Sequence, residues 1–313
     1  MIEHKWLTSD DPQAMLDDCV HRSHPDIPTY RTPSDRKLRL FAVACCRQVW
    51  NKLTDERSRR AVEVAERYAD GLATEKELAR ARSGASSARN YGNETPRYYP
   101  LWLAHVCTCA DIASIIAVVG RQDELPLLIS PATQADLLRD IVGNPFRLVP
   151  LRWEDGELCG YAGEAQHGFH RPTPYYEPVR WLTPLVRQLA QAAYDEHGHK
   201  CGDRDCQDGR WGPHHCERCN GTGTIEDGTL DSDRLLILAD ALEDAGCNNE
   251  EMLQHLRGKE QCEGWCGFEC MNGFLLAGDG SGPCQTCCGT GWRPLRGPHV
   301  RGCHVLDCLL GKE

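Results

Sequence analysis

The sequence predicts a mainly α fold, in which a helical bundle is interrupted twice in its last third by short cysteine-rich segments. Apolar residues recur at helical spacing through most of the first 196 residues, and several of these segments follow a capping residue. The 41% hydrophobic and 26% charged residues are ordinary for a globular protein, and 313 residues can bury a large core. Closely spaced cysteine pairs, by contrast, gather between residues 201 and 288.

Each expected helix of the first 196 residues but one begins at a capping or first-turn signal. These signals are Ser34 for a helix over 35–53, Thr54 for one reaching Tyr68, the capping box of Thr74 with Glu77, Thr133 for one ending at Val142 before Gly143, and Thr183-Pro184 for one reaching Asp195. The exception, over about 100–119, is apolar nearly all round, as expected at the centre of a bundle. Segment 144–182 is rich in proline, glycine and aromatic residues and is expected to be an irregular connection lying on the bundle.

Two more helices are expected between the cysteine segments. Asp231 or Ser232 opens one that runs through Ala245, and Asn248 or Asn249 opens another to about Arg257; residues 299–310 are expected to form a closing helix. The predicted organisation is a helical domain over 1–196, a first cysteine module over 197–230, a helical hairpin of the main domain over 231–258, a second cysteine module over 259–296, and the closing helix within 297–313. Modules on either side of a hairpin could both project from the same end of the bundle.

The two modules repeat one pattern. The first reads Cys201-x4-Cys206-Gln-Asp-Gly and then Cys216-x2-Cys219-Asn-Gly-Thr-Gly, and the second reads Cys266-x3-Cys270-Met-Asn-Gly and then Cys284-x2-Cys287-Cys-Gly-Thr-Gly. Two residues between cysteines let a tight turn aim both sulfurs at one ion, and the glycines that follow let the chain bend and its amides donate to sulfur. Segments this short cannot build a core alone, so each is expected to hold a structural Zn²⁺ on a small knuckle- or ribbon-like β-hairpin.

The predicted ligands are four cysteines for each ion: Cys201, Cys206, Cys216 and Cys219 for the first, and Cys266, Cys270, Cys284 and Cys287 for the second. Matching Cys206-x-Asp-Gly to Cys270-x-Asn-Gly selects Cys266 and Cys270, although Cys262 and Cys288 compete in this copy. In the first copy His199, His214 or His215 could replace a cysteine, and ligands of the two copies could also cross-pair. The amino terminus has no apolar signal core and no stretch suits a membrane span, so we expect a cytoplasmic protein whose thiols bind metal rather than form disulfides.

Four stretches outside the cysteine modules resemble an uncharacterised helical family abundant in planctomycete bacteria. They are Ser34-Asp-Arg-Lys-Leu-Arg-Leu-Phe-Ala-Val-Ala-Cys-Cys-Arg-Gln-Val-Trp50, residues 54–70, Leu238-Ala-Asp-Ala-Leu-Glu-Asp-Ala-Gly-Cys247 and Gly297-Pro-His-Val-Arg-Gly-Cys303. The resemblance implies no activity, but many members join the hairpin directly to the Gly-Pro-His-Val stretch, which implies that 259–296 is an insertion. Residues 216–223 and 284–291 are also similar to the Cys-x-x-Cys-x-Gly-x-Gly repeats of DnaJ-type chaperones, which implies zinc knuckles.

The expected function is that of a non-catalytic adaptor or interaction scaffold that binds another protein through its zinc modules. Four thiolates leave no open metal position for a catalytic water, and the chain has no Ser-His-Asp elbow or phosphate-binding glycine loop. A net charge of -11 argues against a phosphate-binding face, so a nucleic-acid-associated regulator is the alternative, followed by a thiol-redox or chaperone-like protein. Aromatic residues concentrate in the modules and would suit a protein partner if exposed: Trp211, Trp265, Phe268, Phe274 and Trp292.

Overall fold

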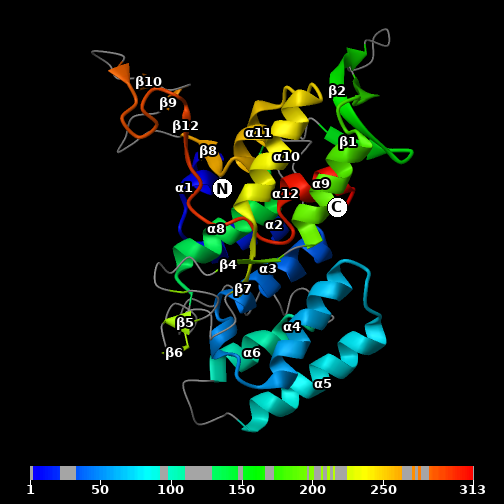
Figure 1. Cartoon of the computed structure of the whole chain (residues 1–313), viewed down its shortest axis with the longest axis vertical. Coiled ribbons are helices and arrows are strands. Elements are labelled where there is room, and N and C mark those ends of the chain that lie inside the picture. The colour runs from blue at the N-terminus through cyan, green and yellow to red at the C-terminus, as the bar shows by residue number, and fades with distance from the viewer. Residues whose placement is uncertain are drawn as a thin grey trace.

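The computed structural model describes residues 3–21, 33–91, 98–109, 129–146, 151–165, 173–195, 197–200, 206, 210–211, 214–215, 224–262, 270–271, 274–275 and 282–312. Within these residues the chain is mainly helical and carries several small antiparallel sheets (Figure 1), which confirms the predicted helical class. None of the described helices combines the length and apolar character that a membrane crossing needs.

The amino-terminal helices share a first hydrophobic core with α3 at its centre. They are α1 (Glu3–Thr8), α2 (Pro12–His21), α3 (Asp35–Gln48), the 3-10 helix η1 (Trp50–Lys52), α4 (Glu56–Ala69), α5 (Glu75–Tyr91), α6 (Tyr98–Val106) and α8 (Pro131–Val142). Helix α3 contacts α4, α6 and α8, and Phe41 and Cys45 on it are buried in this core. The buried Cys45 and Cys46 are therefore core residues.

Capping side chains set most of these helix starts, and two of them differ from the predicted residue. Ser34 Oγ accepts a hydrogen bond from the amide of Lys37, and Thr74 and Glu77 form the predicted capping box. Helix α4 is capped by Asp55 rather than Thr54, and α8 by Ser130 rather than Thr133. In both cases two capping residues lie close together, and the sequence alone does not decide which of them reaches a first-turn amide.

Two helices end earlier than predicted. Helix α3 stops at Gln48 and continues only as the tight turn of η1 instead of reaching Leu53. Helix α6 ends at Val106 instead of continuing toward 119, because the hydroxyl of Thr108 donates to the carbonyl oxygen of His105, and this local bond competes with the helical pattern. Residues 110–128 lie outside the described residues.

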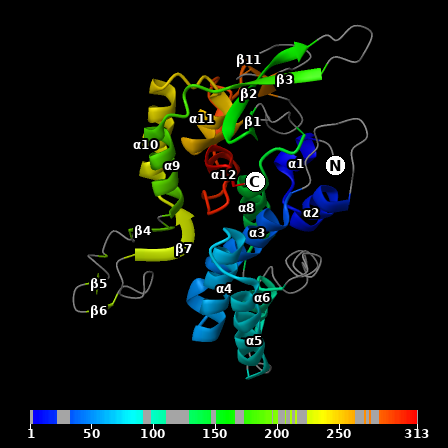
Figure 2. The ribbon, with the colours of Figure 1, turned by 90° about the vertical axis from the view of Figure 1, so that its right-hand side faces the viewer.

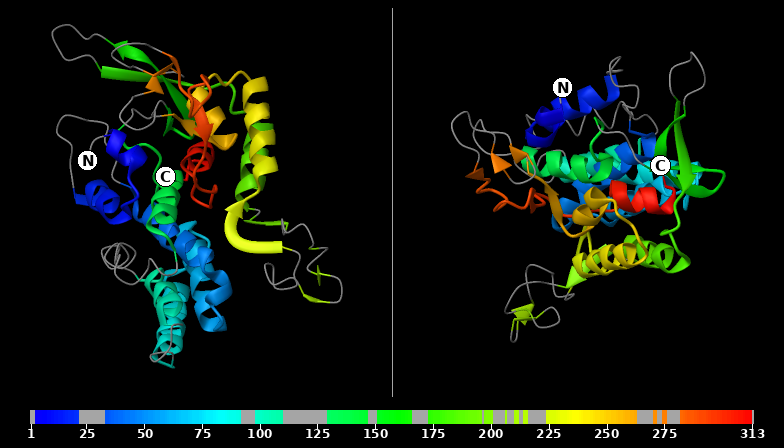
Figure 3. Two further views of the ribbon diagram at one scale, coloured as in Figure 1. Left: turned by 90° about the vertical axis from the view of Figure 1, so that its left-hand side faces the viewer. Right: turned by 90° about the horizontal axis from the view of Figure 1, so that it is seen from above.

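A second hydrophobic core is built from a small sheet and four later helices. Its elements are β1 (Leu151–Glu154), β2 (Glu157–Ala165), β3 (Thr173–Pro178), α9 (Pro184–Asp195), α10 (Ser232–Asp244), α11 (Glu250–Leu256) and α12 (His304–Leu310). Asp231 and Asn249 cap α10 and α11, and α9 has the predicted bounds. Figures 2 and 3 show α9 and α10 on one side of the molecule and α1 and α2 on the opposite side.

Segment 144–182 is not irregular throughout, because it contains the antiparallel sheet β1-β2-β3. Asp155 and Gly156 connect β1 and β2 and have φ values of 48° and 84°. Both values lie in the left-handed region that a two-residue hairpin turn requires, and Asp-Gly is a common pair for such a turn. This dipeptide was the sequence signal for the sheet.

The closing helix α12 begins at His304 rather than 299. Gly302 has a φ of 94°, which ends any helical path, and a Cβ at this position would lie 2.9 Å from Leu40 Cδ1 of α3. Residues 299–303 form a turn in which Val300 packs in the first core, and Cys303 and α12 then enter the second core. Arg36 of α3 pairs with Asp307 of α12 at 2.7 Å, which also joins the two cores.

Each cysteine module leaves the helical part and returns to it on a two-stranded antiparallel ladder. In the first, β4 (His197–Lys200) pairs with β7 (Thr224–Leu230), and β5 (Arg210–Trp211) pairs with β6 (His214–His215) beyond them. In the second, β8 (Lys259–Gln261) pairs with β12 (Trp292–Pro294), and β9 (Cys270–Met271), β10 (Phe274–Leu275) and β11 (Gly282–Pro283) lie beyond. The modules do not share one end of the bundle: β9 and β10 lie near α11, whereas β5 and β6 lie level with α4 and α6 (Figure 1).

Candidate metal centre

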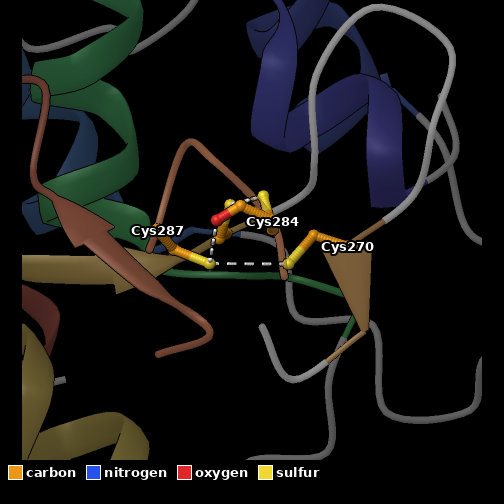
Figure 4. Close-up of side chains that lie close together, drawn as sticks. Cys270, Cys284 and Cys287 are labelled. Carbon is orange, nitrogen blue, oxygen red and sulfur yellow. Dashed lines mark hydrogen bonds between the residues drawn. The ribbon is translucent and has the colours of Figure 1, made fainter. Parts of the chain in front are cut away.

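The second cysteine module brings four sulfurs together, those of Cys262, Cys270, Cys284 and Cys287. All four side chains are buried, and their sulfur atoms lie within 4.8 Å of one another. Figure 4 shows the side chains of Cys270, Cys284 and Cys287 converging from different parts of the module. We call this group the four-sulfur cluster.

Short strands and one turn position these cysteines. Cys262 directly follows β8, Cys270 is the first residue of β9, and Cys284 and Cys287 lie in the turn that follows β11. The amide of Cys262 donates to the carbonyl oxygen of Gly291 at 2.8 Å, just before β12 begins. The ladder of β8 and β12 thus holds the two ends of the module together. The cluster lies just beyond the ladder, where Cys262 follows β8 and Gly291 precedes β12.

The distances between the sulfurs match a metal site and not a disulfide. Cys262 Sγ lies 3.7 Å from Cys284 Sγ, and Cys270 Sγ lies 3.7 Å from Cys287 Sγ. A disulfide would bring two sulfurs to about 2.05 Å. A tetrahedral zinc ion with zinc–sulfur bonds of about 2.3 Å places its sulfurs about 3.8 Å apart. The cluster therefore has the size of a four-thiolate zinc site.

Backbone groups around Cys287 complete the site. The amide of Gly291 donates to Cys287 Sγ at 3.3 Å, as amides commonly do to metal-binding sulfur. Gly291 can do so because the chain turns through left-handed conformations, with φ of 50° at Cys288, 81° at Gly289 and 79° at Gly291. Glycine accepts such angles without strain, which explains why it stands at two of these three positions.

The same surroundings favour the thiolate form of Cys284. Burial raises the pKa of this thiol, but hydrogen bonds from the amides of Cys287 and Thr286 and from the thiols of Cys262 and Cys270 outweigh burial and bring its pKa to about 6. A thiolate is the form of cysteine that binds metal.

The structure brings three of the four predicted ligands of the second module together. Cys270, Cys284 and Cys287 lie in the four-sulfur cluster, and Cys262, which the sequence left in competition with Cys266, is its fourth member. Cys266 lies outside the described residues. Cys288, the other competitor, is exposed, and its thiol points to the carbonyl oxygen of Gln285.

For the first module, the predicted ligands fall mostly outside the described residues. These are Cys201, Cys216 and Cys219, while Cys206 is described and half-buried. The alternative ligands His199, His214 and His215 lie on strands β4 and β6. The zinc site of this module therefore remains a prediction.

Comparison of the chain with models of protein families, with curated proteins and with solved structures gives no match. The resemblances to a planctomycete family and to DnaJ-type repeats stay expectations drawn from the sequence.

Proposed function

We propose that this chain is a non-catalytic zinc-binding adaptor, which binds another protein through its cysteine modules. The observation that carries the proposal is the closed geometry of the four-sulfur cluster. Four sulfurs fill the tetrahedron that zinc prefers in structural sites, whereas a catalytic zinc keeps a position for water or substrate. The ion would have a structural role, and each cysteine module would hold one.

The packing around the cluster supports this structural role. Cys262, Cys270, Cys284 and Cys287 form a buried group separate from the two hydrophobic cores. A module of this size lacks the apolar side chains to stabilise itself, so binding of the ion would supply the free energy of folding that a core normally provides. The metal would shape the module, and the surface of the module would contact the partner.

An exposed aromatic side chain marks the surface that would contact the partner. Phe274 on β10 is 53% exposed and pairs across the strand with Met271, next to the cluster ligand Cys270. Trp292, at the start of β12, is half-buried. Aromatic side chains at a rigid tip are typical contributors to protein–protein binding energy.

The charges on the described surface favour a protein over a nucleic acid. Near the second module, Arg293 pairs with Glu260 at 2.8 Å, so its charge is already balanced. A groove between α4 and α5 is lined by arginines and glutamates together: Glu56, Arg57, Arg60, Glu63, Arg67, Glu77 and Arg80. Phosphate binding needs a face of one positive sign.

Metal analysis tests the zinc part of the proposal. The full chain, purified without added metal, is measured by native mass spectrometry, and its reactive thiols are counted. We expect Cys284→Ser to lose one zinc ion and Cys216→Ser to lose another, with the eight module ligands protected from alkylation in the unmodified chain. Cysteines bonded to one another in place of zinc would contradict the proposal.

Crosslinking in the native host tests the adaptor part. The unmodified chain is compared with Phe274→Ala and with a matched control, Ile237→Ala, whose side chain is 55% exposed on α10. We expect a protein crosslinked to the unmodified chain to be lost with Phe274→Ala and kept with Ile237→Ala. Crosslinks to nucleic acid that respond to Phe274→Ala would favour the alternative function instead.

A further inference from the structure

A second group of metal-ligand side chains lies inside the helical part of the molecule and shares no residue with the four-sulfur cluster. It consists of Asp140, His255, His299 and Cys303, whose ligand atoms all lie within 4.8 Å of one another. We call it the mixed cluster. Asp140 comes from α8, His255 from α11, and His299 and Cys303 from the turn before α12. Three segments that are far apart in the sequence therefore each contribute at least one side chain to the cluster.

Most distances in the mixed cluster are close to the edges of a small tetrahedron, and the shortest is a hydrogen bond that a bound ion would replace. His299 Nδ1 lies 2.8 Å from Asp140 Oδ1, and His255 Nε2 lies 3.2 Å from the same oxygen. Cys303 Sγ lies 3.3 Å from His255 Nε2 and 3.9 Å from His299 Nδ1. Bonds of about 2.0 to 2.3 Å to a tetrahedral zinc ion would space nitrogen, oxygen and sulfur ligands by about 3.3 to 3.8 Å.

We infer that the mixed cluster binds one divalent transition-metal ion, with Asp140 Oδ1, His255 Nε2, His299 Nδ1 and Cys303 Sγ as its ligands. Two imidazoles, one thiolate and one carboxylate suit Zn²⁺, which accepts nitrogen, sulfur and oxygen donors in a tetrahedron. Mg²⁺ and Ca²⁺ take oxygen ligands almost exclusively and do not suit this set.

The charge of Asp140 calls for a cation at this point. Its side chain is completely buried, yet in the described part of the chain its carboxylate contacts only the imidazoles of His255 and His299 and the amide of Val300. The ammonium group of Lys37 instead pairs with Asp307 and donates to the carbonyl oxygens of Ile141 and Gly302. One Zn²⁺ bound to a carboxylate and a thiolate gives a neutral centre, and buried charges are normally paired or bound to metal.

Neighbouring groups orient the ligands as they do in known metal sites. The amide of Val300 donates to Asp140 Oδ2 at 2.9 Å, which leaves Oδ1 turned toward the histidines. His304 is not a ligand: its Nδ1 donates to the backbone oxygen of Asp140 at 3.0 Å, and its ring lies 4.3 Å from that of His255. Such outer contacts fix the rotamers of metal ligands.

Gly143 makes room for His304. It ends α8 with a φ of 75°, and a Cβ at this position would lie 2.9 Å from His304 Cδ2. Any other residue would push the His304 ring away from Asp140 and His255.

The mixed cluster has the burial of a structural site and not of a catalytic one. Cys303 and Asp140 expose almost none of their surface, and His255 exposes 12% of its side chain. A Cys-His-Asp catalytic group would need its sulfur open to a substrate, and Cys303 is not. A bound ion would join α8 of the first core to α11 and α12 of the second.

This inference is independent of the proposed adaptor function, and metal counting separates the two. The full chain is expressed in zinc-supplemented medium, and zinc is counted by native mass spectrometry. We expect His255→Gln and Cys303→Ser each to lose one ion relative to the unmodified chain. The matched control His304→Gln should keep the full count, because this neighbour is not a ligand.

Combined variants identify which ion is lost. We expect the double variant Cys284→Ser with His255→Gln to lose two ions. If Cys284→Ser alone keeps all zinc, the four-sulfur proposal fails while this one stands. If His255→Gln and Cys303→Ser keep the full count while circular dichroism shows them folded, the inference is overturned.

A measurement on the unmodified chain covers the case in which these variants do not fold. The chain is loaded with ¹¹³Cd²⁺, and its cadmium NMR spectrum is recorded. We expect one resonance at clearly higher field than those of four-sulfur sites, since nitrogen and oxygen ligands shield cadmium more than sulfur does. A spectrum with four-sulfur resonances alone would contradict the mixed cluster as a metal site.

Discussion

The four-sulfur cluster and the mixed cluster both gather ligand side chains, but they differ in what surrounds them. The four-sulfur cluster lies at the base of a small module and is grouped with neither hydrophobic core. The mixed cluster lies where the two cores meet: Ile141 and Val300 beside it belong to the first core, and Leu256 and Val305 to the second. One ion would replace a core that the module lacks, and the other would fasten together two cores that already exist.

This difference predicts opposite effects on stability. Loss of the ion from the four-sulfur cluster should unfold its own module and leave the helices nearly unchanged. Damage to the mixed cluster should weaken the whole helical part, because α8, α11 and α12 all depend on it. Four substitutions, taken from the largest expected effect to the smallest, test this contrast.

Asp140→Ala should have the largest effect. Removing one member of a buried charged group leaves the others uncompensated, which typically costs about 3 to 5 kcal/mol. We expect the free energy of unfolding in urea, followed by helical circular dichroism, to fall by about this amount. A loss below about 1 kcal/mol would show that the mixed cluster does not join the cores.

His304→Ala should have a moderate effect. It removes the hydrogen bond to the Asp140 backbone and the ring packed on His255, but it leaves every proposed ligand in place. We expect a loss of about 1 to 3 kcal/mol in the same urea experiment, as for other buried hydrogen-bonded groups. An effect equal to that of Asp140→Ala would mean that packing, and not the ligand set, explains the stability of this region.

Cys284→Ser should change the global free energy of unfolding by less than about 1 kcal/mol, because the module can open locally while the helices stay folded. Its effect should appear in amide hydrogen exchange, with faster exchange over 282–294 and unchanged exchange in α3 and α8. Faster exchange throughout the helices would contradict the separation of this module from the cores.

Arg257→Ala should have the smallest effect. Arg257 lies two residues after His255, but its guanidinium pairs at the surface with Asp240, at 2.9 Å, and with Glu243. Exposed ion pairs contribute about 0.2 to 1 kcal/mol, so the urea midpoint should hardly move. A fall in the free energy of unfolding as large as that of Asp140→Ala would show that this end of α11 is sensitive to any substitution. The effect of Asp140→Ala could then not be attributed to the mixed cluster.

The two clusters also show what sequence reasoning can and cannot reach. The pair Cys284-x2-Cys287 and its glycines are a local pattern, so the sequence predicts them as ligands, and the structure brings their sulfurs together. Cys262 lies outside the repeated pattern, and only the pairing of β8 with β12 brings it to the cluster. The mixed cluster has no local pattern at all, because Asp140 and His299 are 159 residues apart in the chain.

The fold shows the same difference between features that a local sequence pattern predicts and features that it does not. Helix starts marked by a single capping residue, such as Ser34 and Thr74, were predicted at the right place. Starts with two neighbouring candidates were shifted, as at Thr54 and Asp55. The sheet β1-β2-β3 was not predicted, because segment 144–182 is rich in prolines and glycines, which are typical of irregular connections, and the Asp155-Gly156 turn is a signal of only two residues.

Zinc counting on two single variants, Cys262→Ser and Cys266→Ser, tests the central claim most directly. The first removes a sulfur that the structure places in the four-sulfur cluster, and the second removes the cysteine that the repeated pattern favours. Native mass spectrometry should show one zinc ion fewer in Cys262→Ser and the full number in Cys266→Ser. The reverse result, with zinc lost from Cys266→Ser and kept in Cys262→Ser, would contradict the four-sulfur cluster as the zinc site.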